Sequence, residues 1–189
     1  MEGKFPLFPL FTDISGCRVL VVGGGSVALR RAGTLLTCGA RVTVVSPEFH
    51  EGFQELHESE AFSSAPGTEN PRLIRRPFEN FDLEGFFMVV LATDDRELNR
   101  RVGQRAKKAG LHVSVADARE ECSFFFPALV AEKDAVAAVS GGGRPDLTRR
   151  LADRLRQVWS AWVAEETDRD QNDEEVLSQR EKDHPCRQP

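Results

Sequence analysis

The chain has 189 residues, of which 40% are hydrophobic and 29% charged, a composition that excludes a wholly disordered protein. Its length allows one full-sized domain and a small addition. No apolar run reaches the roughly 18 residues of a membrane span, and the N-terminus lacks a signal-peptide pattern. The four cysteines are scattered and form no CxxC pair, so we expect a reduced, cytoplasmic protein without structural zinc.

The negative charge lies at the C-terminal end. Residues 165–189 hold 9 acidic and 4 basic residues, whereas the first 164 residues hold 21 of each. A neutral body lacks the basic footprint of a nucleic-acid binder. An acidic segment without aromatic residues is typical of a solvated tail. We therefore expect no nucleic-acid partner, no membrane association and a disordered tail over 165–189.

The N-terminal part of the chain has the pattern of a βαβ unit. Residues 18–22 (RVLVV) and 41–45 (RVTVV) are β-branched runs that predict parallel strands. Between them, three glycines precede a helical pattern that begins at Ser26 and that Gly39 ends. Strand, glycine turn, helix and strand within about 30 residues predict a right-handed crossover.

The alternation of strands and helices continues along the chain. The patterns predict a weak helix over 49–62, a turn-rich loop over 63–71, strands over 73–75, 86–92 and 112–116, and a helix that Asp94 or Asp95 caps and Gly110 ends. Repeated alternation of this kind predicts an α/β fold with a Rossmann-like, doubly wound parallel sheet.

The pattern changes after Asp117. Three short β-like runs over 122–126, 128–131 and 135–140 follow without a helix between them, and an amphipathic helix begins near Pro145. The edges of such strands are an aggregation hazard that pairing between two subunits removes, so we expect a homodimer. The predicted segments are a Rossmann domain (1–116), a small β-rich dimerisation module (117–145), a C-terminal helix (146–164) and the acidic tail (165–189).

The turn after the first strand carries a dinucleotide-binding pattern. Gly23, Gly25 and Ala28 follow a strand and open a helix, which is the context that this pattern requires. Gly23 permits the tight turn, Gly25 admits the pyrophosphate, and Ala28 allows close packing of helix on strand. The helix N-terminus presents amide groups and a partial positive charge to phosphates. A glycine turn with a purely structural role is the alternative.

The end of the second strand indicates which dinucleotide is bound. An acidic residue usually stands there to bond the adenosine ribose. Ser46, Pro47 and Glu48 occupy this place instead, and a serine hydroxyl or a backbone group can bond the ribose hydroxyls. Because no arginine replaces the acid, we expect NAD rather than NADP.

Polar residues follow two further strands at the carboxyl edge of the sheet, where ligands of open α/β sheets bind. Thr93 and Asp94 are candidates to face the nicotinamide ribose, whereas Asp95 is more typical of a helix cap. Asp117 closes the strand over 112–116, and its position alone fits either a turn residue or a carboxylate that takes a proton. The four histidines form no metal-like cluster, so we predict no resident metal site.

An ordered set of motifs resembles the siroheme synthase N-terminal domain family. The matching residues are Phe5 to Phe8 (FPLF), 21–32 (VVGGGSVALRRA), 42–48 (VTVVSPE), 76–78 (RPF), 92–95 (ATDD), Asn99, 115–117 (VAD), 124–128 (FFFPA) and 138–142 (AVSGG). The resemblance covers about residues 4–160. It implies a Rossmann domain, a dimerisation module and a helical end. It also implies oxidation of precorrin-2 to sirohydrochlorin by NAD, which bifunctional members follow with Fe²⁺ insertion.

The resemblance also implies roles for individual residues. Asp117 matches the aspartate implicated in both steps of the family, which favours a catalytic role for it. Ser26, Val27, Pro47 and Glu48 match positions that line the NAD site, and Gly24 belongs to the same turn. Binding a polycarboxylate tetrapyrrole requires cationic or polar groups near the cleft. The candidates are Arg119, Ser140 and Arg144, with Arg149 and Arg150 as residues that equally fit a solvated helix face.

Departures from the family pattern concern the metal step more than the redox step. Ser114 replaces a common asparagine, Arg119 replaces a common proline, and Gly141 stands where one bifunctional relative carries a regulatory phosphorylated serine. Two alternatives remain open. One is a non-catalytic NAD-binding or redox-sensing Rossmann module, which Asp117 and the dimerisation motifs disfavour. The other is a chelatase without dehydrogenase activity, which the intact glycine turn disfavours.

Overall fold

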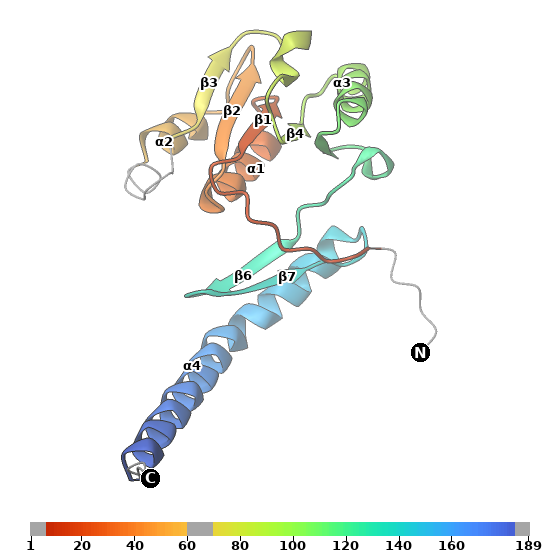
Figure 1. Cartoon of the computed structure of the whole chain (residues 1–189). Coiled ribbons are helices and arrows are strands. Elements are labelled where there is room, and N and C mark those ends of the chain that lie inside the picture. Colours follow the sequence, from red (N-terminus) through yellow and green to blue (C-terminus); the bar gives the residue numbers. More distant parts are fainter. Residues whose placement is uncertain (1–6, 60–69, 184–189) are drawn as a thin grey trace. The chain divides into compact units, whose positions relative to one another are not determined.

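The computed structural model describes residues 7–59 and 70–183, and for residue 81 and residues 170–183 it describes the backbone alone (Figure 1). Phe5 and Pro6 of the first motif, and most of the loop expected over 63–71, lie outside the described residues. The chain forms two compact units, Met1–Phe125 and Phe126–Pro189. The sequence pattern predicts the first boundary at residue 116, whereas the first compact unit extends to Phe125. The boundary falls later because Ser123 still bonds the Rossmann sheet, its amide donating to the carbonyl of Val113 at 2.7 Å.

The first unit is built on a parallel five-stranded sheet in the order β3-β2-β1-β4-β5 (Figure 1). The chain adds β2 and β3 on one side of β1 and then β4 and β5 on its other side. This change of side is the arrangement of a doubly wound fold. Each strand is short. The central residues of β1, β2, β4 and β5 are mostly buried, as their apolar runs predicted, whereas those of β3 are half-buried. The expected Rossmann-like sheet is therefore confirmed, with strands β1 (Arg18–Val22), β2 (Arg41–Ser46), β3 (Arg72–Arg75), β4 (Met88–Leu91) and β5 (His112–Val115).

Helices cover both faces of this sheet. One face packs on α3 (Arg96–Lys108), whose Val102 and Ala106 join the buried strand residues Leu20, Leu91 and Val113 in one core cluster. The opposite face meets α1 (Ser26–Thr37). There, Arg31 donates from Nη1 to the hydroxyl of buried Ser114 at 3.5 Å. The other described helices of this unit are α2 (Gly52–Glu58) and the 3-10 helices η2 (Asn80–Leu83) and η3 (Arg119–Glu121).

The second unit consists of an antiparallel hairpin and a long helix. Strands β6 (Ala128–Glu132) and β7 (Ala135–Val139) pair with each other, and α4 (Pro145–Asp183) runs along them (Figure 1). Two side chains of α4 attach it to β6. Arg156 donates to the carbonyl of Leu129 at 3.2 Å, and the Ser160 hydroxyl donates to Glu132 at 2.7 Å.

The helix α4 continues past the point where the sequence predicted a disordered tail. It ends at Asp183 rather than near residue 164, so 165–183 is helical in the structure. Local ion pairs account for part of this extension: Arg169 lies 2.7 Å from Glu165 and 2.9 Å from Glu166. Each pair of this spacing stabilises a helix by about 0.2–0.5 kcal/mol. Composition alone did not reveal them.

The strand expected over 122–126 is wrong. This segment follows η3 as a loop, and side chains as well as backbone amides bond it to β5. The thiol of Cys122 accepts from the amide of Val115 at 3.2 Å, and the hydroxyl of Ser123 accepts from the amide of Val113 at 2.7 Å. Side chains that bond a neighbouring backbone in this way compete with regular strand pairing. The helix expected over 49–62 begins later than predicted, at Gly52, and ends at Glu58. Residues 60–62 of the predicted range lie outside the described residues.

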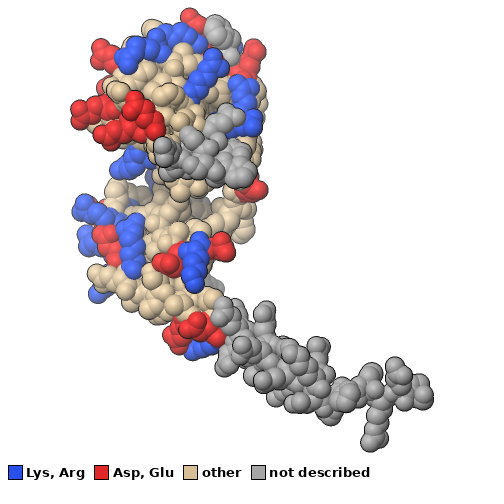
Figure 2. Space-filling view, turned by 90° about the vertical axis from the view of Figure 1, so that its left-hand side faces the viewer, with Lys and Arg blue, Asp and Glu red and all other residues tan. Residues whose placement is uncertain are grey.

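Charges of both signs share the surface. On the face shown in Figure 2, Lys and Arg side chains lie among Asp and Glu side chains on each of the two units. No helix within residues 7–59 and 70–183 combines the length and the apolar character that a bilayer crossing requires.

Candidate functional site

The three glycines after β1 differ in what surrounds them. Gly23 has φ +115°, and a Cβ there would lie 2.3 Å from the carbonyl oxygen of Ala92. A Cβ on Gly24 would lie 1.9 Å from the carbonyl oxygen of Glu48. No atom lies within 4 Å of a Cβ built on Gly25. Gly23 and Gly24 therefore permit close backbone approach to the loops after β4 and β2, and Gly25 opens onto free space.

The free space lies at the N-terminus of α1. Gly25 is the N-cap of this helix, no side chain caps it, and the first turn contains no acidic residue. Ser26 and Val27 are exposed there, and Ala28 is fully buried against the sheet. A helix N-terminus with uncapped amides and no competing carboxylate fits a phosphate group. The residues present therefore fit the pyrophosphate of a dinucleotide.

The loop after β2 lies against the glycine turn. The amide of His50 donates to the carbonyl of Gly24 at 2.7 Å. Ser46 is 7% exposed at the end of β2, and its hydroxyl would lie 2.8 Å from a Cβ on Gly24. Pro47 and Glu48 are exposed beside it. These residues lie where the adenosine half of a dinucleotide bound at the glycine turn would extend.

An arginine that the sequence did not single out lies beside this loop. Arg75 ends β3 and is the register partner of Ser46 on β2. Its guanidinium lies 5.2 Å from the centroid of the Phe49 ring. The expectation of NAD relied on the end of β2 alone, where no arginine stands. A neighbouring strand supplies a cation instead, and this is visible only once the strand order is known.

The loop after β4 contains two of the predicted residues and one helix cap. Asp95 accepts from the amide of Leu98 at 2.9 Å, so its capping role is confirmed. Asp94 is exposed at the tip of the loop. The hydroxyl of Thr93 donates to Oδ1 of Asn99 at 2.7 Å. Thr93 therefore has a fixed orientation, and Asp94 is open to a ligand.

Asp117 follows β5 and stays accessible. Its side chain is 42% exposed, and Oδ2 lies 3.6 Å from Nε of Arg96. Oδ1 accepts from Nδ2 of Asn99 at 3.4 Å. Arg96 also forms an ion pair with Glu121, and its hydrogen bond holds the pKa of that carboxyl below the ordinary value. The same bond raises the pKa of Arg96, which therefore stays cationic next to Asp117.

The three predicted substrate residues are divided between the two units. Arg119 belongs to the first, and its guanidinium lies 4.2 Å above the ring of Phe125. Ser140 and Arg144 belong to the second, in the turn between β7 and α4. There, Arg144 donates from Nε to the carbonyl of Gly141 at 3.4 Å. Arg119 thus follows Asp117 by two residues in the chain, and Ser140 and Arg144 belong to one turn.

Gly141 is packed too tightly for any side chain. A Cβ there would lie 2.7 Å from the hydroxyl of Thr148 and 2.8 Å from the carbonyl oxygen of Arg144. The amide of Gly141 donates to that hydroxyl at 2.9 Å. The glycine at this position is therefore a requirement of the turn that begins α4.

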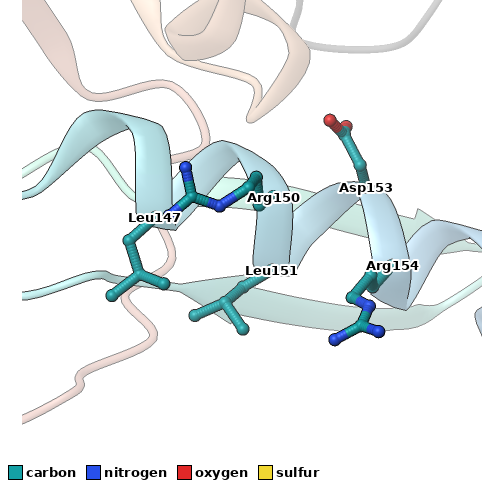
Figure 3. Close-up of a pocket in the computed structure, with 5 residues that line it drawn as sticks. All are labelled: Leu147, Arg150, Leu151, Asp153 and Arg154. Atoms are coloured by element: carbon teal, nitrogen blue, oxygen red, sulfur yellow. The ribbon is translucent and has the colours of Figure 1, made fainter.

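An open pocket of about 330 Å³ lies elsewhere, along α4 (Figure 3). Leu147 and Leu151 supply apolar surface to it, and Arg150, Asp153 and Arg154 supply charge. Of the candidate substrate residues, Arg150 lines this pocket, whereas Arg119, Ser140 and Arg144 do not. Among the described residues, no three His, Cys, Asp or Glu side chains gather as a metal site would require.

Most of the predicted residues form one row along the carboxyl edge of the parallel sheet. The loop after β2 contacts Gly24, Gly23 contacts Ala92, and Thr93 connects through Asn99 to Asp117. The row therefore runs across β2, β1, β4 and β5 in the order of the sheet. Sequence reasoning missed the parts of Asn99 and Arg96 in this row. Asn99 was named only as one residue of the family pattern, without a role. Arg96 had no signal beyond its position directly after the cap Asp95.

Comparison with known proteins places the chain in a family. A family model described as "Putative NAD(P)-binding" matches residues 10–128. The chain belongs to this NAD(P)-binding family. The match covers the glycine turn and the strand ends described above, so a nicotinamide dinucleotide is the cofactor class of this site.

Several curated proteins are similar to the chain over most of its length. "Siroheme synthase" of Ectopseudomonas mendocina is 40% identical over 151 residues, which are 80% of this chain and 30% of that protein. The "Probable multifunctional siroheme biosynthesis protein HemA" of Ruminiclostridium josui is 38% identical over 156 residues, 82% of this chain and 28% of that protein. The chain thus spans under a third of the length of these relatives.

A solved structure shares the fold. "SirC, precorrin-2 dehydrogenase" superposes with a TM-score of 0.66 at 29% sequence identity. The alignment covers 84% of this chain and 76% of that one. The likeness therefore includes most of both chains.

Proposed function

We propose that the chain oxidises precorrin-2 to sirohydrochlorin with NAD, as a dehydrogenase of siroheme biosynthesis. The row of residues along the carboxyl edge of the sheet carries this proposal, because a series of contacts from Gly23 to Asp117 joins a dinucleotide turn to an accessible carboxylate. The likeness to siroheme synthases and to a precorrin-2 dehydrogenase supports the choice of substrate.

The dinucleotide would extend along this row. Residues 23–27 would hold the pyrophosphate, with Gly25 leaving the space it needs at the N-terminus of α1. Ser46, Pro47 and Glu48 would line the adenosine half. Thr93 and Asp94 would line the nicotinamide ribose. The bound cofactor supplies the acceptor for the hydride that leaves the substrate.

Asp117 would take the proton that the substrate loses with the hydride. A carboxylate that is 42% exposed at the end of β5 is accessible to a substrate, and its Oδ2 lies 3.6 Å from Nε of Arg96. A positioned general base contributes typically 10²- to 10⁴-fold to a rate. Arg119, Ser140 and Arg144 would bind substrate carboxylates and polar groups.

We also propose a cytoplasmic homodimer built on the β6–β7 hairpin. A two-stranded hairpin has two unpaired edges, and Val136 on β7 is 45% exposed. Pairing with a second copy would cover both features. The free thiols of Cys17, Cys38 and Cys122 fit a reducing compartment. Light scattering at micromolar concentration tests the assembly, and a monodisperse monomer would contradict it.

The proposed reaction is tested by incubating the purified chain with precorrin-2 and following absorbance. Parallel reactions contain NAD, NADP or no dinucleotide, and each is repeated with Fe²⁺ or Co²⁺ as a substrate for insertion. The proposal predicts sirohydrochlorin formation that depends on dinucleotide, with NAD preferred. The NADP reaction measures whether Arg75 admits a 2′-phosphate. No oxidation with either dinucleotide would overturn the proposal, and metal insertion alone would identify a chelatase.

A further inference from the structure

The carboxamide of Asn99 joins the ends of two strands. Asn99 lies on α3, four residues after the cap Asp95, and its side chain is fully buried. A buried amide that lacks partners costs about 1–3 kcal/mol of stability. Its contacts therefore show what this position does in the fold.

Every polar group of this carboxamide is engaged. Oδ1 accepts from the hydroxyl of Thr93 at 2.7 Å and lies 3.4 Å from the Thr93 amide, which donates to it. Nδ2 donates to the carbonyl of Thr93 at 2.9 Å and to Oδ1 of Asp117 at 3.4 Å. The reverse orientation of the amide would set NH₂ against the Thr93 amide and oxygen against two acceptors. The contacts thus fix one orientation of Asn99.

The two oxygens of Asp117 have different partners on the same helix. Oδ1 receives the Asn99 donor, and Oδ2 faces Arg96 at 3.6 Å. Arg96 is 43% exposed and also forms an ion pair with Glu121 of η3. The carboxylate of Glu120 adds a further negative charge near its guanidinium. The Arg96 contact is therefore open to screening by salt, and the buried Asn99 contact is not.

We propose that Asn99 is a positioning residue that holds Asp117 and Thr93 in one fixed relation. The inference rests on the proposed function, in which Thr93 lines the nicotinamide ribose and Asp117 takes the proton. Hydride and proton leave the same substrate, so the cofactor and the base must be held at fixed positions relative to each other. A misplacement of about 1 Å can cost about 10²-fold in rate. Asn99 touches neither substrate nor cofactor and acts through its two neighbours.

The wild-type chain allows a test that needs no change at Asn99. In an NMR titration, the side-chain ¹⁵N resonance of Asn99 is expected to move with pH and to follow the titration of the Asp117 carboxyl. In Asp117→Asn, the same resonance is expected to stay constant. A wild-type resonance that ignores pH across the titration of Asp117 would refute the contact, and with it the proposal.

Variants test the consequence for the reaction. Asn99→Ser and Asn99→Ala remove the donor to Asp117 and the carboxamide contacts with Thr93, so both side chains lose their fixed placement. We expect kcat to fall about tenfold while the KM for NAD changes less than about threefold. The matched control is Arg100→Gln on the same helix, which breaks only the ion pair with Glu97 and is expected to change neither quantity.

The salt dependence separates Asn99 from its neighbour. Arg96→Gln is expected to lower kcat by a factor that shrinks as salt is added, whereas the effect of Asn99→Ser on kcat is expected to persist. A folded Asn99 variant with unchanged kcat would overturn the proposal while leaving the dehydrogenase intact. An inactive wild-type chain would instead overturn the proposed function, and the NMR titration would still decide whether Asn99 holds Asp117.

Discussion

Replacing Gly25 by valine separates cofactor binding from stability. The backbone of Gly25 has φ −79° and ψ −177°, an extended conformation that any residue adopts, and a Cβ there meets no atom within 4 Å. Gly25→Val therefore costs little more than the preference for glycine at an N-cap, about 1 kcal/mol or less. In a chain of this size the thermal midpoint falls by no more than about 4 °C.

Cofactor binding should suffer far more. The valine side chain would fill the space that the pyrophosphate needs at the N-terminus of α1. Hydrogen bonds to a charged group contribute about 1.5–3 kcal/mol each. Losing two of them costs about 3 kcal/mol, which raises the Kd for NAD at least about a hundredfold. Calorimetry with NAD and thermal unfolding measure the two effects separately.

Two other glycines provide the controls. Gly24→Ala would place a Cβ 1.9 Å from the carbonyl oxygen of Glu48, so it should lose about 1–3 kcal/mol of stability. Gly33→Ala lies farther along α1, where a Cβ has only an ordinary contact of 4.0 Å with Leu56, and should retain both stability and binding. A folded Gly25→Val chain with unchanged affinity for NAD would refute the assignment of the glycine turn.

Three further predictions concern the base, an ion pair and the end of the chain. Asp117→Asn keeps the shape of the side chain and removes its basicity, so dehydrogenation should fall at least about 10²-fold while NAD still binds by calorimetry. The hydrogen bond from Arg76 lowers the pKa of Asp82 below its ordinary 3.8, so the native state holds fewer protons than the unfolded state between the two values. Asp82→Asn should therefore lower the free energy of unfolding by its full amount above pH 3.8, and this loss should disappear as the pH falls through the lowered pKa of Asp82. Thermal unfolding at several pH values would show this dependence. Truncation after Ala164 removes a segment whose described side-chain bonds are local to α4, so activity should stay within about twofold in a steady-state assay.

The sequence predicted the Rossmann sheet because its signals are local. Residues 18–22 and 41–46 are rich in β-branched residues, and glycines stand directly after the first run and shortly before the second. Gly39 ends α1 because it adopts a left-handed backbone, with φ +78°. The cap at Asp95 is equally local, since it bonds an amide three residues away. Such features depend on neighbours in the chain, so a single sequence reveals them.

The parts that the sequence did not predict depend on tertiary contacts. Gly24 is required by a carbonyl oxygen on the loop after β2, and Asn99 has its role because β4 and β5 end side by side. The loop over 122–126 resembled a strand in composition, but Cys122 and Ser123 bond β5 with their side chains. None of these contacts follows from spacing along the chain.

The most direct test of the proposed function is the stoichiometry of one turnover. Excess wild-type chain is mixed with precorrin-2 and NAD, and absorbance follows reduced nicotinamide and sirohydrochlorin together. Since one hydride and one proton leave the substrate, one reduced nicotinamide should form for each sirohydrochlorin, and Asp117→Asn should slow both at least about 10²-fold. Sirohydrochlorin formed without reduced nicotinamide, or neither product formed, would contradict a dehydrogenase built on this edge of the sheet.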